Sequence, residues 1–151
     1  MTFSPVDTIY THYPALERRE DEWGRFGEEA VRLRDILVKL SGHSLLLMNE
    51  TLSSTAMGEA IYLAKDVLEL IKEIGCRAVY VTHMHELARI EAEPILSFVA
   101  TTREVGGEHV PTFRLVPGKP EGKSYAADIA ARYGLELGAL RAARNGVGQR
   151  E

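Results

Sequence analysis

The chain has few of the residues that mark secreted or membrane-spanning proteins. Cys76 is the single cysteine among 151 residues, which excludes an internal disulfide and predicts a buried thiol in a reducing compartment. No apolar run approaches the length of a membrane span, and the first residues lack the basic-then-apolar pattern of a signal peptide. We therefore expect a cytoplasmic protein without a membrane partner.

An excess of positive charge is also missing. The 18 Lys and Arg residues stand against 22 Asp and Glu, for a formal net charge of −4. Binding to nucleic-acid phosphates without regard to sequence needs clustered Lys and Arg. Any contact with DNA would therefore have to come from regions outside these residues.

The length and the apolar content predict one domain. A hydrophobic fraction of 45% is enough for a core in a chain of 151 residues. We expect this domain to span residues 1–144. Residues 145–151 contain two glycines and no apolar cluster, so they are predicted to form a flexible tail.

The most informative stretch is Ser44-Leu-Leu-Leu-Met-Asn-Glu50, an unbroken apolar run closed by polar residues. It predicts a buried strand, and the run at residues 78–81 predicts a second one. Residues 58–74 between them carry an apolar stripe opposite a charged side, which indicates a helix that Gly75 ends in a left-handed conformation. Two strands joined by such a helix form a βαβ unit with parallel strands.

Polar side chains follow both predicted strands. Asn49 and Glu50 close the first strand and His83 follows the second, and ligand groups of α/β proteins gather at such strand ends. A core strand that simply ends in a loop would leave the same pattern. A metal site at His83 and His85 is a weaker alternative, because its further carboxylate and histidine ligands would have to come from elsewhere in the chain.

The remaining patterns predict the elements around this unit. A short strand is expected within residues 6–12, a charged loop at 17–22 and a helix over 28–40. Two β-rich runs, 95–102 and 110–116, predict an antiparallel hairpin. Ser124 is the expected N-cap of a helix that Gly134 ends, and residues 135–144 predict a last short helix.

The order of these features resembles the ATPase domain of the MutS family, a branch of the ABC-type ATPases. A strand ending in Glu50, a Ser/Thr-rich loop with Thr55, a helix and a strand ending in Thr82-His83 carry the resemblance. It covers residues 6–140 and extends to Glu86-Leu87, Leu115-Val-Pro-Gly118 and Ser124-Tyr125. The resemblance implies an α/β fold of the P-loop NTPase (ABC/MutS-like) type, with a parallel sheet core, an antiparallel β-hairpin extension and flanking helices. It also implies a role in DNA mismatch repair or related DNA processing.

The resemblance assigns roles at the strand ends, with residues 45–50 as the Walker B strand. Beside bound ATP, Glu50 would orient or deprotonate the attacking water, and His83 would hydrogen-bond the γ-phosphate. Asn49 would hold the shell around Mg²⁺ through water, weakly, because the family commonly has Asp at this place and an amide lacks the charge.

A second group of residues would meet a partner subunit. Gly24-Arg-Phe-Gly-Glu-Glu29 resembles the family's signature segment, with Phe26 and Glu29 at matching positions. In the family this segment caps the nucleotide of the other subunit, so Gly24, Arg25 and Phe26 are expected at the cofactor of a homo-oligomer. Thr55 matches the loop that crosses to the partner. Gly24-Arg25 replaces the family's usual Ser-Thr pair, whose Ser reaches the γ-phosphate bound by the partner subunit. Here Arg25 or a backbone N–H would have to contact that phosphate instead. Without a ligand role, the glycines mark a helix start and Ser53, Ser54 and Thr55 are N-cap candidates.

One family element does not occur in the 151 residues. The G-x-x-x-x-G-K-[ST] loop, which cradles phosphates, would lie N-terminal to residue 6. We therefore expect the chain alone to be a weak or inactive ATPase. The competing hypothesis is a non-catalytic dimerisation or regulatory module that keeps the scaffold.

The strand that feeds this loop would pair beside residues 78–81. Its absence predicts an unpaired edge, which favours pairing with another strand. Either the hairpin at 95–116 closes the gap within the chain, or a second copy supplies a strand, which is the outcome we favour.

Overall fold

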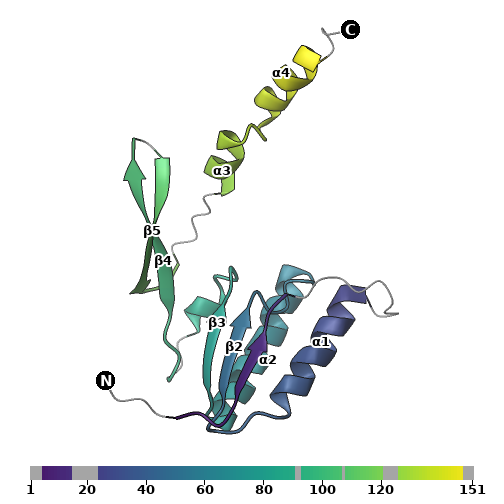
Figure 1. The fold of residues 1–151 in the computed structure, drawn as a ribbon, viewed down its shortest axis with the longest axis vertical. Helices are drawn as coiled ribbons and strands as arrows, with labels where there is room; N and C mark the ends of the chain where they lie inside the picture. Colours follow the sequence, from purple (N-terminus) through teal and green to yellow (C-terminus); the bar gives the residue numbers. More distant parts are fainter. Residues whose placement is uncertain (1–4, 15–23, 91–92, 107, 121–125, 148–151) are drawn as a thin grey trace. The chain divides into compact units, whose positions relative to one another are not determined.

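The computed structural model describes residues 5–14, 24–90, 93–106, 108–120 and 126–147 (Figure 1). The chain divides into two compact units, Met1–Ile95 and Leu96–Glu151. The amino-acid patterns did not indicate this division. The predicted charged loop at residues 17–22 and the predicted N-cap Ser124 lie outside the described residues.

The first unit is built on a three-stranded parallel sheet. Its strands β1 (Ile9–His12), β2 (Leu45–Asn49) and β3 (Arg77–Val81) lie in the order β1-β2-β3. The helix α2 (Met57–Ile74) connects β2 to β3, and the parallel pairing of these strands confirms the predicted βαβ unit. β2 is the central strand because the chain's most apolar run can be buried only where neighbours flank it.

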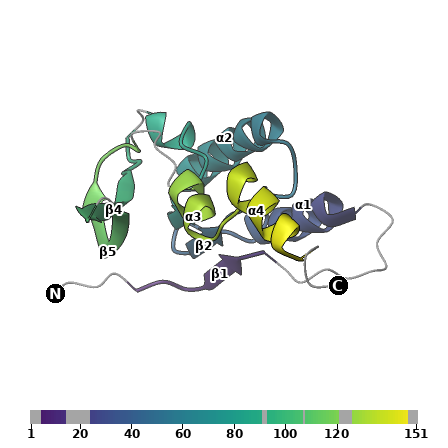
Figure 2. The same ribbon diagram turned by 90° about the horizontal axis from the view of Figure 1, so that it is seen from above.

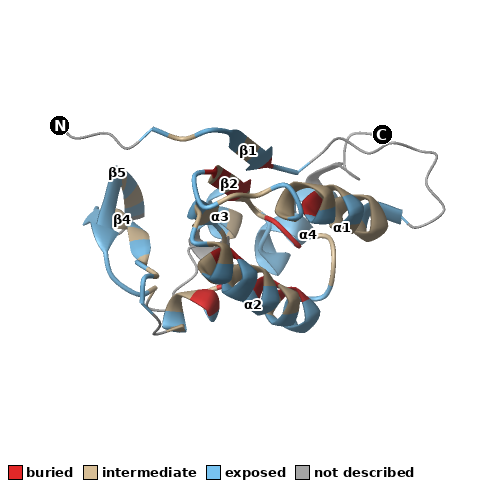
Figure 3. Ribbon diagram, turned by 90° about the horizontal axis from the view of Figure 1, so that it is seen from below, coloured by how far each residue is buried: buried red, intermediate tan, exposed pale blue. Residues whose placement is uncertain are grey.

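Two helices cover one face of this sheet. The helices α1 (Gly24–Leu37) and α2 lie on the same side of β1 and β2 (Figure 2). Figure 3 shows the buried residues on β2 and on parts of both helices. Leu46 and Met48 of β2 pack with Ile71 of α2, and half-buried residues of α1 complete this cluster. The alternation along β2 therefore decides which side chains enter the core.

The helix ends follow from local chemistry. Gly75 has φ 75° and its N–H donates to the carbonyl oxygens of Ile71 and Lys72, which confirms the predicted left-handed end of α2. α1 starts at Gly24 and ends at Leu37, earlier at both ends than the predicted 28–40. The difference arises because the apolar stripe marks the buried turns only, while Leu40 packs on the core from outside the helix.

The second unit begins with an antiparallel hairpin. β4 (Phe98–Val105) pairs with β5 (Glu108–Pro117) in a two-stranded sheet of its own, which confirms the predicted hairpin. Closure of the first sheet by this hairpin, the alternative that we favour less, stays a prediction. Within the described residues of the first unit, no strand pairs with the outer edge of β3. Pairing of this edge with a second copy stays a prediction.

Two short helices follow, α3 (Ala126–Arg132) and α4 (Leu137–Val147). Gly134, at φ 69°, ends α3 as predicted: its N–H donates to Ala131 O, and the N–H of Leu135 donates to Ala130 O. α4 runs to Val147, so residues 145–147 of the predicted tail are helical. Within the described residues, no helix combines the length and apolar character that a membrane span requires.

Candidate functional site

Glu50 and His83 meet at the carboxyl edge of the first sheet. Since β2 and β3 are parallel neighbours, the residues that follow them emerge on the same edge. The N–H of Glu50 donates to Val81 O over 2.9 Å, which carries the ladder one residue beyond β2. His83 Nδ1 lies 2.5 Å from Glu50 Oε2, and the side chains remain 56% and 33% exposed. Glu50 and His83 therefore lie together at the sheet edge, as predicted, and both side chains are accessible to solvent.

The backbone turns sharply at this point. Glu50 has φ 50° and Leu52 has φ 68°, a left-handed conformation that costs non-glycine residues about 1–3 kcal/mol each. After β3, the hydroxyl of Thr82 accepts from the N–H of Met84 over 3.1 Å and shapes the turn that contains His83. Two constrained turns, rather than extended strand ends, thus present the pair.

Asn49 is the last residue of β2 and lies opposite Val81 in the register. Its side chain is half-buried next to Glu50. Over the described ranges, no group of three or more His, Cys, Asp and Glu residues is placed to hold a metal ion. The structure thus gives no support to a metal site at His83 and His85, and the role of Asn49 near Mg²⁺ stays a prediction.

The segment that resembles the family's signature forms the first turns of α1. Gly24, with φ 65°, and Arg25 are exposed. Phe26 instead packs against the core cluster that contains Leu33 and Leu52, so its ring is partly committed to the core. Contacts of Gly24, Arg25 and Phe26 with a partner's nucleotide stay predictions.

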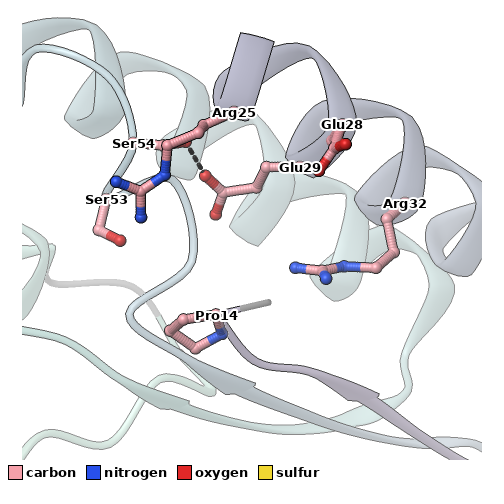
Figure 4. A pocket seen from close by; sticks show the side chains of 7 residues that line it. All are labelled: Pro14, Arg25, Glu28, Glu29, Arg32, Ser53 and Ser54. Atoms are coloured by element: carbon pink, nitrogen blue, oxygen red, sulfur yellow. Dashed lines mark hydrogen bonds between the residues drawn. The ribbon is translucent and has the colours of Figure 1, made fainter. Parts of the chain in front are cut away.

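A small pocket of about 40 Å³ lies between α1 and the loop after β2 (Figure 4). Glu29 and Arg32 point into it above Pro14, and the pocket does not include Glu50 or His83. Its lining residues are Pro14, Arg25, Glu28, Glu29, Arg32, Ser53 and Ser54. The first turns of α1 and the Ser/Thr-rich loop, which the resemblance relates separately to a partner subunit, are therefore neighbours within one chain.

The loop residues do not cap α2 in the predicted way. The N-cap of α2 is Ala56, which makes no side-chain capping bond, so the prediction of Ser53, Ser54 or Thr55 at this position is wrong. Thr55 donates instead to the Glu59 carboxylate over 2.8 Å. The N–H of Ala60 finds its partner in Ala56 O, and the helix begins without a hydroxyl cap. The Ser54 hydroxyl donates to Glu29 instead.

The pattern of residues gave no indication of a role for His12 in the site. His12 is only 1% exposed, and its Nδ1 lies 2.9 Å from the Thr51 hydroxyl. Burial, and then the charge of Arg32, lowers the pKa of His12. Because Arg32 can only donate to Nε2, at 3.4 Å, the neutral ring donates from Nδ1 to Thr51. His12 lies at the carboxyl end of β1, beside the end of β2, and this position in the predicted sheet could have identified it as a site residue.

Two further groups hold the same loop. The Tyr80 hydroxyl donates to Thr51 O over 2.8 Å, and burial raises the pKa of Tyr80. Glu29 accepts the N–H of Leu52 at 2.6 Å with one oxygen. Its other oxygen accepts the hydroxyl of Ser54 (Figure 4). Thr51, Leu52 and Ser54 are thus hydrogen-bonded to residues of β1, β3 and α1.

These features define an α/β domain with an acid–histidine pair at the edge of a parallel sheet. Residues 1–149 match the family described as MutS domain V, and the chain belongs to this family. It is similar to proteins named DNA mismatch repair protein MutS. The one from Treponema denticola is 30% identical over 143 residues, which are 94% of this chain and 16% of the relative.

Two further relatives with the same name show a similar overlap. The protein from Carboxydothermus hydrogenoformans is 32% identical over 133 residues, 86% of this chain and 16% of its own length. The protein from Desulforamulus reducens is 29% identical over 149 residues, 97% of this chain and 17% of its own. The chain therefore spans about a sixth of the length of the curated relatives that it matches.

Proposed function

We propose that this chain is part of an ATP-binding and ATP-hydrolysing domain that acts in DNA mismatch repair or related DNA processing. The observation that carries the proposal is the contact of Glu50 with His83 at the carboxyl edge of a parallel sheet, in a chain of the MutS domain V family. Nucleotide-binding α/β proteins use this edge for their ligands.

Glu50 serves as the base in this proposal. Its carboxylate is one-third exposed, so a water molecule can reach it, and the hydrogen bond to His83 limits its orientations. With Nδ1 of His83 engaged by Glu50, Nε2 is the ring atom left to face a phosphate oxygen. Nε2 donates only when the imidazole is protonated, because the neutral ring has one N–H. The protonated ring would thus hold Glu50 and the phosphate together.

Only part of a nucleotide site is supplied by these residues. Oxygen ligands suit Mg²⁺, and Asn49 and Glu50 place an amide and a carboxylate at the sheet edge. Bound Mg²⁺–ATP would supply the phosphoryl group and the charge that polarises it. The 151 residues contain no G-x-x-x-x-G-K-[ST] loop, so a separate segment has to cradle the phosphates.

Isothermal calorimetry with Mg²⁺–ATP tests the proposal. We expect weak or no binding by the 151-residue chain. Binding and hydrolysis should appear when a MutS-type segment with the phosphate-binding loop is added. If the assembled protein does not bind ATP, the proposal fails.

A second candidate function is a non-catalytic dimerisation or regulatory module. The outer edge of β3 favours it, because that edge has no partner strand among the described residues of the first unit and Val79 and Val81 are each 53% exposed. Such a module would associate with itself whether or not ATP is present. Hydrolysis of ATP by the assembled protein would favour the catalytic function over the non-catalytic module.

A further inference from the structure

Residues 50–55 follow β2 directly and form a loop whose backbone conformation is unfavourable for the residues that adopt it. Glu50 and Leu52 both have positive φ, which is disfavoured for residues with a side chain. Such a backbone persists only where the surrounding structure holds it. The contacts of this loop therefore decide how Glu50 is presented to His83.

Glu29 makes the central contact. Its two carboxylate oxygens accept the N–H of Leu52, at 2.6 Å, and the hydroxyl of Ser54. A charged acceptor makes such bonds stronger than a neutral one. The Leu52 side chain is 3% exposed and packs with Leu33 in the core, so the N–H that Glu29 accepts belongs to an anchored residue.

The same carboxylate links the loop to the start of α1. Glu29 lies one helical turn and a half beyond Gly24, and it lines the pocket together with Arg25 and Ser54. A shift of this helix end moves the carboxylate, and with it the backbone two residues after Glu50. His12 and Tyr80 hold Thr51 from the sheet side, so Glu29 supplies the hold from the helix side.

We propose that Glu29 is a positioning residue: it fixes the backbone of residues 50–54 and so keeps the Glu50 carboxylate in place beside His83. This inference rests on the proposed function, because it assigns to α1 a part in hydrolysis. It also makes a claim about the chain without nucleotide, namely that the Leu52 amide is protected by Glu29.

Amide hydrogen exchange in the full 151-residue chain tests that claim directly. In Glu29→Ala we expect the Leu52 amide to exchange about tenfold faster. Glu29→Gln should exchange within about threefold of the parent, since its amide oxygen still accepts from Leu52 and its NH₂ can donate to Ser54. Glu73→Ala removes an exposed carboxylate from α2 and should leave the exchange unchanged.

Unchanged exchange of Leu52 in Glu29→Ala overturns the inference. If Glu29→Ala does not fold, Ser54→Ala removes one of the two bonds and should speed the exchange about fivefold, and parent-like exchange there overturns it equally.

Hydrolysis by the assembled protein tests the part played in catalysis. Glu29→Ala should lower kcat about tenfold with the KM for ATP unchanged, and Glu29→Gln should restore most of kcat. A parent-like kcat with a freed Leu52 amide would show that the loop does not position Glu50. The two proposals fail separately: if the assembled parent hydrolyses no ATP, the proposed function and the catalytic role of Glu29 fall, while the exchange data still decide whether Glu29 holds the loop.

Discussion

The exposed carboxylate of Glu50 is the residue on which the proposed chemistry depends. Glu50→Gln keeps the size and the hydrogen-bonding shape of the side chain but removes the base. We expect hydrolysis by an assembled, active protein to fall at least about 100-fold, while ATP binding persists. Steady-state hydrolysis together with calorimetry measures both. A variant that hydrolyses ATP at the parent rate would remove Glu50 from the mechanism.

His12 ties stability to pH. Burial and Arg32 lower its pKa in the folded chain below the ordinary value of 6.5, so at mildly acidic pH the unfolded chain binds more protons than the folded one. The stability that His12 contributes is present above pH 6.5 and is lost as the pH falls from there through the lowered folded pKa. Urea unfolding between pH 5 and 7.5 should show this loss.

A matched pair of variants isolates the contribution of His12. His12→Gln should flatten the pH dependence of the free energy of unfolding, since it removes the buried group that titrates. His43→Gln makes the same change at an exposed histidine and should keep the slope of the parent. Equal slopes in the two variants would mean that other groups cause the pH dependence.

At the scale of elements, the end of α2 determines where β3 begins. Gly75 has φ 75°, and a Cβ added there would have no atom within 4 Å. Gly75→Ala therefore introduces backbone strain without a clash. We expect a loss of about 1 kcal/mol in the free energy of unfolding, measured in urea. Gly58→Ala, in the first turn of α2 and equally open, should instead leave stability unchanged or raise it by about 0.5–1 kcal/mol. A harmless Gly75→Ala would contradict this account of the helix end.

The sequence predicted the helices and strands well and the candidate site only in part. The apolar run of β2, the stripe of α2 and the two β-rich runs of the hairpin each report local preferences, and each element forms. Parallel pairing predicted that Glu50 and His83 lie at the same edge of the sheet, whereas the turns that bring them into contact were not predicted. The capping of α2 could not be predicted in this way, because the Ser54 hydroxyl has a competing partner in Glu29, 25 residues earlier, and the Thr55 hydroxyl has one in Glu59.

For the whole molecule, the outer edge of β3 is the feature with the clearest consequence. Its backbone groups have no partner strand in the described part of the first unit, and Val79 and Val81 add exposed apolar surface. We expect the chain to self-associate as its concentration rises, through strand pairing at β3. Sedimentation velocity across a concentration series measures this association.

Charge at this edge should prevent the association. Val79→Lys is expected to shift the chain toward the monomer, since lysine on an edge strand opposes pairing. Val38→Lys makes the same change at an exposed valine outside the sheet and should sediment as the parent does. A parent that stays monomeric at every concentration would overturn the prediction that a second copy pairs with this edge.

Residue patterns alone predicted the strands, the helix that joins β2 to β3, the glycine ends of α2 and α3, and the strand ends that carry Glu50 and His83. All of these depend on preferences of residues close together along the chain. The packed structure was needed to show that His12 and Tyr80 hold Thr51 and that Glu29 holds Leu52 and Ser54. These contacts join residues that are more than 20 positions apart. The spacing of apolar residues along the sequence does not indicate such pairs, because long-range burial and hydrogen bonding depend on how the elements pack together.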